Sequence, residues 1–189
     1  MEIILKKEDI SEIVKEVACK LNKSIEKEET IPIFIGVMTG ALNFMMDIIK
    51  HIKCDILTDY VHISSYKGNK SINKVNIKYE PAVEIQNRTI VLIEDFIDTG
   101  FSIDFLLSFL NRNYKPAKII LVALLERNSR ANKHHDINII GKKIDCDCFL
   151  IGYGLDYLGI GRNYEDIYAC DKKDLERIKN KLKGVKNYV

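Results

Sequence analysis

The segment Thr89–Ser102, TIVLIEDFIDTGFS, joins an apolar run to three carboxylates and a short polar loop. Glu94 and Asp95 follow the apolar residues directly, and Asp98 comes three residues later. Two adjacent carboxylates resist joint ionisation unless cations or hydrogen-bond donors offset them. Neighbouring side chains of a regular strand point to opposite faces, so we expect only one of the pair to face a cleft easily. The alternative is a pair of acids that faces solvent where a strand ends.

The residues after the acidic pair favour a phosphate site. Gly100 permits backbone conformations that are closed to other residues. Thr99 and Ser102 supply hydroxyls, and the start of the helix expected next offers free N–H groups. This combination suits a phosphate monoester. Acids beside it indicate a ligand that has both hydroxyls and phosphate, such as a ribose phosphate.

Apolar strands and amphipathic helices alternate along the chain. Residues 8–28 carry apolar side chains at the three-to-four spacing of one buried helix face. Helices are also expected at 40–52 and 102–113, and strands at 31–38, 55–66 (or a hairpin arm), 89–95, 117–126 and 148–156. Strands that are apolar on both faces predict an α/β fold with a mainly parallel sheet between helices. Ligands of such sheets bind at the carboxyl ends of the strands, where GVMTGA and EDFIDTG both fall.

Composition narrows the class of protein. The 189 residues are 47% hydrophobic and 30% charged, with no linker or repeat, which predicts a single folded domain. A net charge of +2 gives no reason to expect nucleic acid or a membrane as partner. The apolar runs are too short to span a bilayer, and the first residues lack the pattern of a signal peptide. A cytoplasmic protein is therefore expected.

The five cysteines follow no framework spacing. Cys146 and Cys148 could form a metal-binding pair, but no second pair with ligand spacing follows. We therefore expect all five to be reduced thiols.

The acidic pair, two apolar residues, Asp-Thr-Gly and a serine after an apolar strand resemble the phosphoribosyl-diphosphate (PRPP) signature of type I phosphoribosyltransferases. Within that family the match is closest to the hypoxanthine-guanine branch. Further blocks resemble the family's diphosphate loop, lid and base-binding segments; they are FIGVMTGALNFMMDI, SSYKG, VALLERNSR and FLIGYGLDY. The resemblance runs from about Ile33 to Cys170.

The resemblance implies a mainly parallel central sheet flanked by helices. It also implies a small hood formed by the terminal segments, about 1–10 and 145–189, within one domain, 1–189. The reaction implied is transfer of ribose 5-phosphate from PRPP to N9 of a 6-oxopurine, hypoxanthine and also guanine, with Mg²⁺ as cofactor. The products are IMP or GMP and diphosphate. Two alternatives stay open: a PRPP-binding regulatory protein without transferase activity, and a transferase for another base such as xanthine.

A homo-oligomer, dimer or tetramer, is implied as well. Beyond Cys170, the apolar residues Leu175, Ile178 and Leu182 form a thin stripe on a charged helix. Subunit packing and plain surface cover are both open for this stripe.

Roles for the acids follow from the resemblance. Glu94 and Asp95 are implied to hold the ribose hydroxyls and to place Mg²⁺, and Asp156 is implied to bind a second Mg²⁺. Asp98 is implied to act as the base near purine N7. The implied 5′-phosphate loop consists of Asp98, Thr99, Gly100, Phe101 and Ser102. Phe101 stands where polar residues are common, which a loop binding through backbone N–H groups tolerates.

Thr39 and Gly40 match the diphosphate loop, which in the family often carries a cis non-proline peptide bond, and Arg162 matches a diphosphate-binding arginine. The alternative for Thr39-Gly40 is an ordinary strand-to-helix turn. Ser65 and Tyr66 match a lid that excludes water, with residues 68–70 in its loop. Tyr66 as a simple surface aromatic is the alternative.

Three residues match the purine-binding positions. Phe149 corresponds to a ring that stacks on the base, although core packing is an alternative for an aromatic in an apolar strand. Leu150 corresponds to a residue whose backbone reads the base edge. Arg127 stands where a lysine usually donates to the 6-oxo group, and its wider fork leaves the preferred base open.

Overall fold

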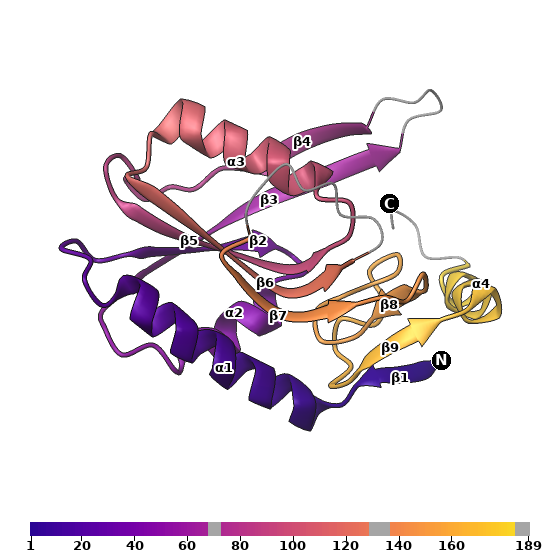
Figure 1. Ribbon diagram of the computed structural model, residues 1–189. Coiled ribbons are helices and arrows are strands. Elements are labelled where there is room, and N and C mark those ends of the chain that lie inside the picture. Colours follow the sequence, from indigo (N-terminus) through magenta and orange to yellow (C-terminus); the bar gives the residue numbers. More distant parts are fainter. Residues whose placement is uncertain (68–72, 129–136, 184–189) are drawn as a thin grey trace.

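The computed structural model describes residues 1–67, 73–128 and 137–183, and at 65–67, 73 and 74 it describes the backbone alone. Within these residues the strands form a large and a small sheet (Figure 1). The large sheet has the order β4 (Asn73–Tyr79), β3 (Leu57–Lys67), β2 (Ile33–Met38), β5 (Thr89–Ile97), β6 (Lys118–Arg127) and β7 (Ile139–Ile144). The five neighbouring strands β3, β2, β5, β6 and β7 run parallel, and β4 pairs antiparallel with β3 at the edge of the sheet. The predicted α/β fold with a mainly parallel sheet is confirmed.

Helices cover both faces of this sheet. The helices α1 (Lys7–Ile25) and α2 (Leu42–Ile49) lie on one face, and α3 (Phe101–Tyr114) lies on the other (Figure 1). Alternate side chains of the strands serve the two faces. Phe34 of β2 belongs to the apolar cluster that α1 and α2 complete, whereas Ile33 and Ile35 belong to the cluster of α3. The continuous apolar strands are therefore explained by burial on both sides.

The small sheet is built from the two ends of the described chain. Its order is β1 (Glu2–Leu5), β9 (Ile167–Cys170) and β8 (Phe149–Ile151), with antiparallel pairs. The helix α4 (Lys172–Lys181) follows β9, and we call β1, β8, β9 and α4 together the hood (Figure 1). Ile178 of α4 packs on Ile151 and Cys170, so part of the stripe on this helix is covered by the hood itself.

The strand predicted at 148–156 is shorter than expected, because β8 ends at Ile151. Gly152, Tyr153 and Gly154 all have positive φ angles, which no regular strand can contain. The backbone turns there instead, and Gly152 exchanges hydrogen bonds with Leu155. This turn brings the hood back over the carboxyl ends of the large sheet. Every helix in the described ranges is too short or too polar to cross a membrane.

Candidate active site

A cavity of about 330 Å³ lies at the carboxyl ends of β2 and β5. These strands are adjacent and parallel, so the turns that follow them meet at one edge of the sheet. The cavity is lined by residues of the diphosphate loop, the acidic pair, the phosphate loop and the connection between β8 and β9. Of the residues singled out in the sequence, it is lined by Thr39, Gly40, Glu94, Asp95, Asp98, Thr99, Gly100, Ser102, Asp156 and Arg162.

Both members of the acidic pair line this cavity, so the expectation that only one would easily face it is wrong. The carboxylate of Asp95 accepts a hydrogen bond from the N–H of Phe96, 2.8 Å away, within a strand that continues to Ile97. Asp95 is buried, and Oε2 of Glu94 is buried without a hydrogen-bond partner among the described residues. Ionisation of these two carboxyl groups is therefore less favourable than it would be at a strand end in solvent.

Burial raises the pKa of Glu94 well above its ordinary value, and the adjacent Asp95 carboxylate adds to the shift. Burial also raises the pKa of Asp95, while the positive charge of Arg162 acts in the opposite direction. Two buried carboxyl groups with an oxygen left unpaired fit a divalent cation, since Mg²⁺ needs only one or two carboxylates beside water and phosphate oxygens. Asp156 is held differently: one oxygen lies 2.5 Å from Nη2 of Arg162, and the other accepts from the N–H of Gly159.

The phosphate loop leads straight into α3. Gly100 has a φ of 82° in the left-handed region, and the helix begins at the next residue. Its first-turn N–H groups consequently open toward the loop. Phe101 is 42% exposed and is absent from the residues that line the cavity. Its side chain points away, which explains how a phenylalanine fits in a polar loop.

The turn after β2 has a cis peptide bond between Met38 and Thr39, as expected for this loop. Gly40 follows, and the hood turn approaches it so closely that a β-carbon on Gly154 would lie 2.2 Å from the Gly40 carbonyl oxygen. Arg162 supports the same turn, because Nη1 donates to the carbonyl of Gly154 at 2.7 Å. Hood and sheet thus meet at the diphosphate loop.

Ser65 and Tyr66 lie near the end of β3, and only their backbone is described. Residues 68–70 lie outside the described residues. The roles of these residues as a lid stay predictions.

A second cavity, of about 420 Å³, adjoins the first and shares with it Asp95, Phe96, Asp98 and Asp156. Arg127, Phe149 and Leu150 line this second cavity, as do Phe96, Asp147, Cys148 and Leu155, which the sequence did not single out for the site. Phe149 is 42% exposed and meets the ring of Tyr157 edge-on at 5.2 Å between centroids. Core packing of Phe149 is therefore excluded, and its ring is accessible from the cavity.

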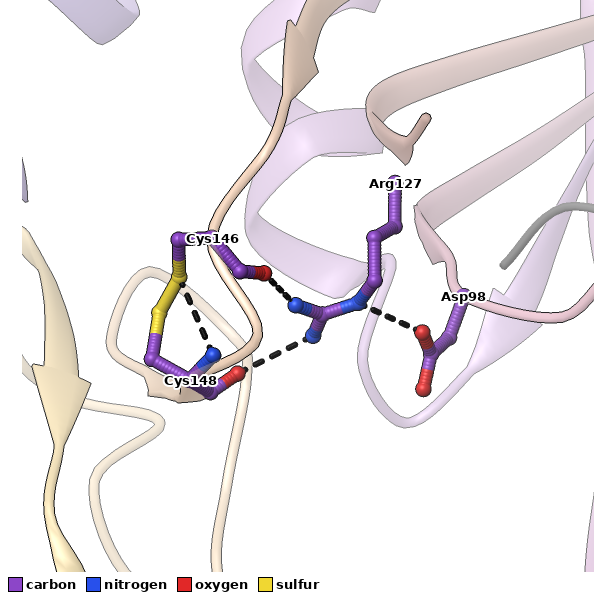
Figure 2. Close-up of a disulfide and its surroundings, with 4 residues drawn as sticks. All are labelled: Asp98, Arg127, Cys146 and Cys148. Atoms are coloured by element: carbon purple, nitrogen blue, oxygen red, sulfur yellow. Dashed lines mark hydrogen bonds and ion pairs between the residues drawn. A yellow bond between two sulfur atoms is a disulfide. The ribbon is translucent and has the colours of Figure 1, made fainter. Parts of the chain in front are cut away.

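Arg127 ends β6 and is almost completely buried, with 2% of its surface exposed. Its Nε donates to Oδ1 of Asp98 at 2.6 Å, and its two terminal nitrogens donate to the carbonyls of Cys146 and Cys148 (Figure 2). The guanidinium also lies over the ring of Phe96, 5.0 Å from its centroid. Arg127, which the sequence predicted to donate to the purine, thus donates to Asp98, the residue predicted to act as the general base.

Cys146 and Cys148 are joined by a disulfide, so the expectation of five reduced thiols is wrong for this pair (Figure 2). Their Cα atoms are 5.3 Å apart, a separation that a disulfide spans readily. Cys19, Cys54 and Cys170 are free. The Cys-x-Cys spacing of residues 146 and 148 is the sequence signal that accompanies this bridge.

The acidic pair and the loop of residues 98–102 lie at the carboxyl end of β5, beside the turn that follows the adjacent parallel strand β2, in an α/β protein with a mainly parallel sheet. The chain belongs to the phosphoribosyl transferase domain family, whose model matches residues 1–158.

Named relatives agree with this family. The chain is 34% identical over 165 residues to the hypoxanthine-guanine phosphoribosyltransferase of Bacillus subtilis, covering 86% of this chain and 88% of that protein. It is 30% identical over 172 residues to the enzyme of the same name from Aquifex aeolicus, covering 90% and 95%. A crystal structure of a hypoxanthine phosphoribosyltransferase from Staphylococcus aureus superposes with a TM-score of 0.83 at 30% identity, over 92% of each chain.

Proposed function

We propose that this chain is a purine-salvage phosphoribosyltransferase. It transfers ribose 5-phosphate from PRPP to N9 of a 6-oxopurine, hypoxanthine and also guanine, and releases diphosphate. The observation that carries the proposal is the junction of the two cavities at Asp95, Asp98 and Asp156. One cavity offers a phosphate loop and acids for a sugar phosphate, and the other offers an accessible ring for a flat base. The names of the relatives support the same reaction.

In this reaction Glu94 and Asp95 accept hydrogen bonds from the ribose hydroxyls. Their carboxylates also stabilise the positive charge that develops on the sugar as the bond from C1′ to diphosphate breaks. Glu94, Asp95 and Asp156 are the residues that would hold Mg²⁺, which supplies charge neutralisation for the departing diphosphate when bound. Arg162, which is paired with Asp156 in this structure, binds diphosphate oxygens with its planar fork and then releases Asp156.

Asp98 accepts the proton that the purine loses as N9 forms its bond to C1′. It lines both cavities, which is the position this role requires. General-base assistance is typically worth about 10² to 10⁴ in rate. Backbone groups of Thr99, Gly100 and Ser102 hold the 5′-phosphate, so that the reacting carbon faces the base.

The base lies against Phe149, with the backbone of Leu150 at its edge, in the cavity that Arg127 also lines. Thr39 and Gly40 bind diphosphate, and Ser65 and Tyr66 close over the centre. Residues 1–189 act as one domain, which is supported by a family match over residues 1–158 that includes the large sheet and the strands β1 and β8 of the small one. The protein works in the cytoplasm as a homo-oligomer, a dimer or a tetramer, with no nucleic acid or membrane partner. Light scattering after size-exclusion chromatography tests the oligomer.

A steady-state assay with PRPP and Mg²⁺ tests the function, using hypoxanthine, guanine, xanthine and adenine in parallel. We expect IMP from hypoxanthine and GMP from guanine, each with release of one diphosphate. PRPP binding without turnover of any base would instead indicate a regulatory protein. Turnover of xanthine alone would indicate a transferase for another base.

A further inference from the structure

The guanidinium of Arg127 has little freedom to move. Three of its N–H groups are engaged, one by Asp98 and two by the carbonyls of Cys146 and Cys148 (Figure 2). A buried cation without partners is strongly unfavourable, so each of these bonds compensates for the water that Arg127 has lost. The ring of Phe96 closes one side of the group. Swinging Arg127 toward a ligand would break several buried bonds at once.

Asp98 stands at the other end of this arrangement. Its side chain is 39% exposed, whereas that of Arg127 is 3% exposed, so the ion pair has one fixed partner and one accessible partner. Asp98 lines both cavities. The fixed guanidinium therefore determines where the accessible carboxylate lies. A charge-assisted bond of 2.6 Å is short enough to define that position closely.

The carbonyls that hold Arg127 belong to the two disulfide-bonded residues. Cys146 and Cys148 lie in the connection between β7 and β8, where no strand pairing holds the backbone in place. A covalent link across two residues removes conformations from this short segment. The N–H of Cys148 also donates to Sγ of Cys146 at 3.3 Å. The bridge consequently fixes both acceptor oxygens relative to one another.

We propose that Arg127 is a positioning residue for Asp98 and that the Cys146–Cys148 disulfide fixes the two carbonyls that hold Arg127. Purine transfer then depends on the redox state of this cysteine pair. A dithiol reduces the bridge by thiol–disulfide exchange. The S–S bond breaks, Cys146 and Cys148 each gain a proton and an electron, and the two sulfurs of the dithiol join in a new disulfide. The proposal rests on the proposed function, because the readout is transfer to a purine.

Arg127→Lys tests the positioning role. Lysine keeps the positive charge, but its single nitrogen cannot hold Asp98 and two carbonyls in one plane. We expect kcat to fall about 10- to 100-fold, the equivalent of one hydrogen bond to a charged group, while the Kd for PRPP measured without a purine stays within about twofold. A general structural defect would weaken both quantities together. An unchanged kcat would overturn the positioning role.

Reduction of the wild-type protein tests the redox link and needs no variant. Thiol alkylation of the unfolded protein, followed by mass spectrometry, should count three thiols in the oxidised protein and five after treatment with dithiothreitol. These numbers match the three free cysteines and the one bridge. We expect reduction to lower kcat/KM for hypoxanthine about tenfold or more, a loss of the same origin. Five thiols without added reductant in air-oxidised protein, or equal kinetics in both states, would overturn the redox link.

Two double variants complete the design. The double variant Cys146→Ser with Cys148→Ser should have the kcat/KM of the reduced protein, and dithiothreitol should not change it. Cys19→Ser with Cys54→Ser, which removes two exposed free thiols, should respond as the wild type does. A response that persists in the first double variant would contradict the proposal. Failure of the wild type to use any purine would count against the proposed function instead, whereas an active wild type with these variants unaffected would count against this inference alone.

Discussion

Gly40 and Asp95 are packed so closely that a β-carbon on Gly40 would lie 2.0 Å from Oδ2 of Asp95. The diphosphate loop and the acidic pair, 55 residues apart in sequence, therefore share one small space. Gly40 has no positive φ, so an alanine is compatible with its backbone. The absence of a side chain at this position serves the carboxylate beside it.

Gly40→Ala is accordingly expected to damage the site more than the fold. The new methyl group must push the buried carboxylate of Asp95 aside, and misplacement of a reacting group by about 1 Å can cost about 10² in rate. We expect kcat/KM for PRPP to fall by about that factor, with only a small change in melting temperature. Leu42→Ala, at an exposed position two residues later, is the matched control. Wild-type kinetics for Gly40→Ala would mean that Asp95 tolerates displacement.

Replacing Glu94 by Gln and Asp95 by Asn together is expected to abolish most PRPP affinity. Both carboxylates face the cavity, and a hydrogen bond to a charged group contributes about 1.5–3 kcal/mol. Titration calorimetry with and without a magnesium chelator measures this. Chelation should weaken binding to the wild type and should have little further effect on the double variant. Retained affinity would reduce the pair to a strand end.

Asp98→Asn is expected to lower kcat about 10²- to 10⁴-fold while PRPP still binds, because an amide cannot accept the purine proton. The asparagine side chain has the same shape as aspartate, so its Oδ1 can still accept a hydrogen bond from Arg127. Rapid-mix single-turnover kinetics separates this chemical step from product release. A kcat equal to that of the wild type would remove Asp98 from the role of base.

Phe149→Ala is expected to raise KM for hypoxanthine and to leave PRPP binding unchanged. Stacking of a base on an aromatic ring contributes about 1–3 kcal/mol, so the increase should be about 5- to 100-fold. Phe149→Leu, which keeps an apolar side chain but removes the ring, provides the comparison. If leucine restores the wild-type KM, apolar cover and not stacking is what the base needs.

Glu28 supports a pH-dependent part of the stability, away from the site. Hydrogen bonds from Lys118, at 2.8 Å, and from Thr89 lower its pKa in the folded protein. A lowered pKa stabilises the fold above the unfolded-state value of about 4.3, and this stability is lost as pH falls through the lower folded-state value. The free energy of unfolding of Glu28→Gln at pH 7 should therefore be lower than that of the wild type, by about 1 kcal/mol or less. This difference in the free energy of unfolding should shrink as pH falls below the unfolded-state value of about 4.3. A difference that persists in acid would assign the effect to packing.

Local patterns in the sequence predicted a large share of this fold. The spacing of apolar residues in 8–28 anticipated α1, which runs from Lys7 to Ile25, because helix periodicity is set by residues three and four apart. The buried run before Glu94 likewise anticipated β5. The hood strands β1 and β9 escaped prediction. They are four residues each, and they pair across more than 160 positions, so no local window contains both.

The sequence by itself determined which residue types reach the edge of the sheet: two adjacent acids, a third acid, and a Gly-containing loop before a helix. These follow from composition and spacing, which act locally. Only the tertiary structure decided that both Glu94 and Asp95 face one cavity, that Phe101 turns away, and that Arg127 holds Asp98. Such relationships depend on contacts between segments that are distant in the sequence. Burial and charge compensation select among them only when the whole chain has folded.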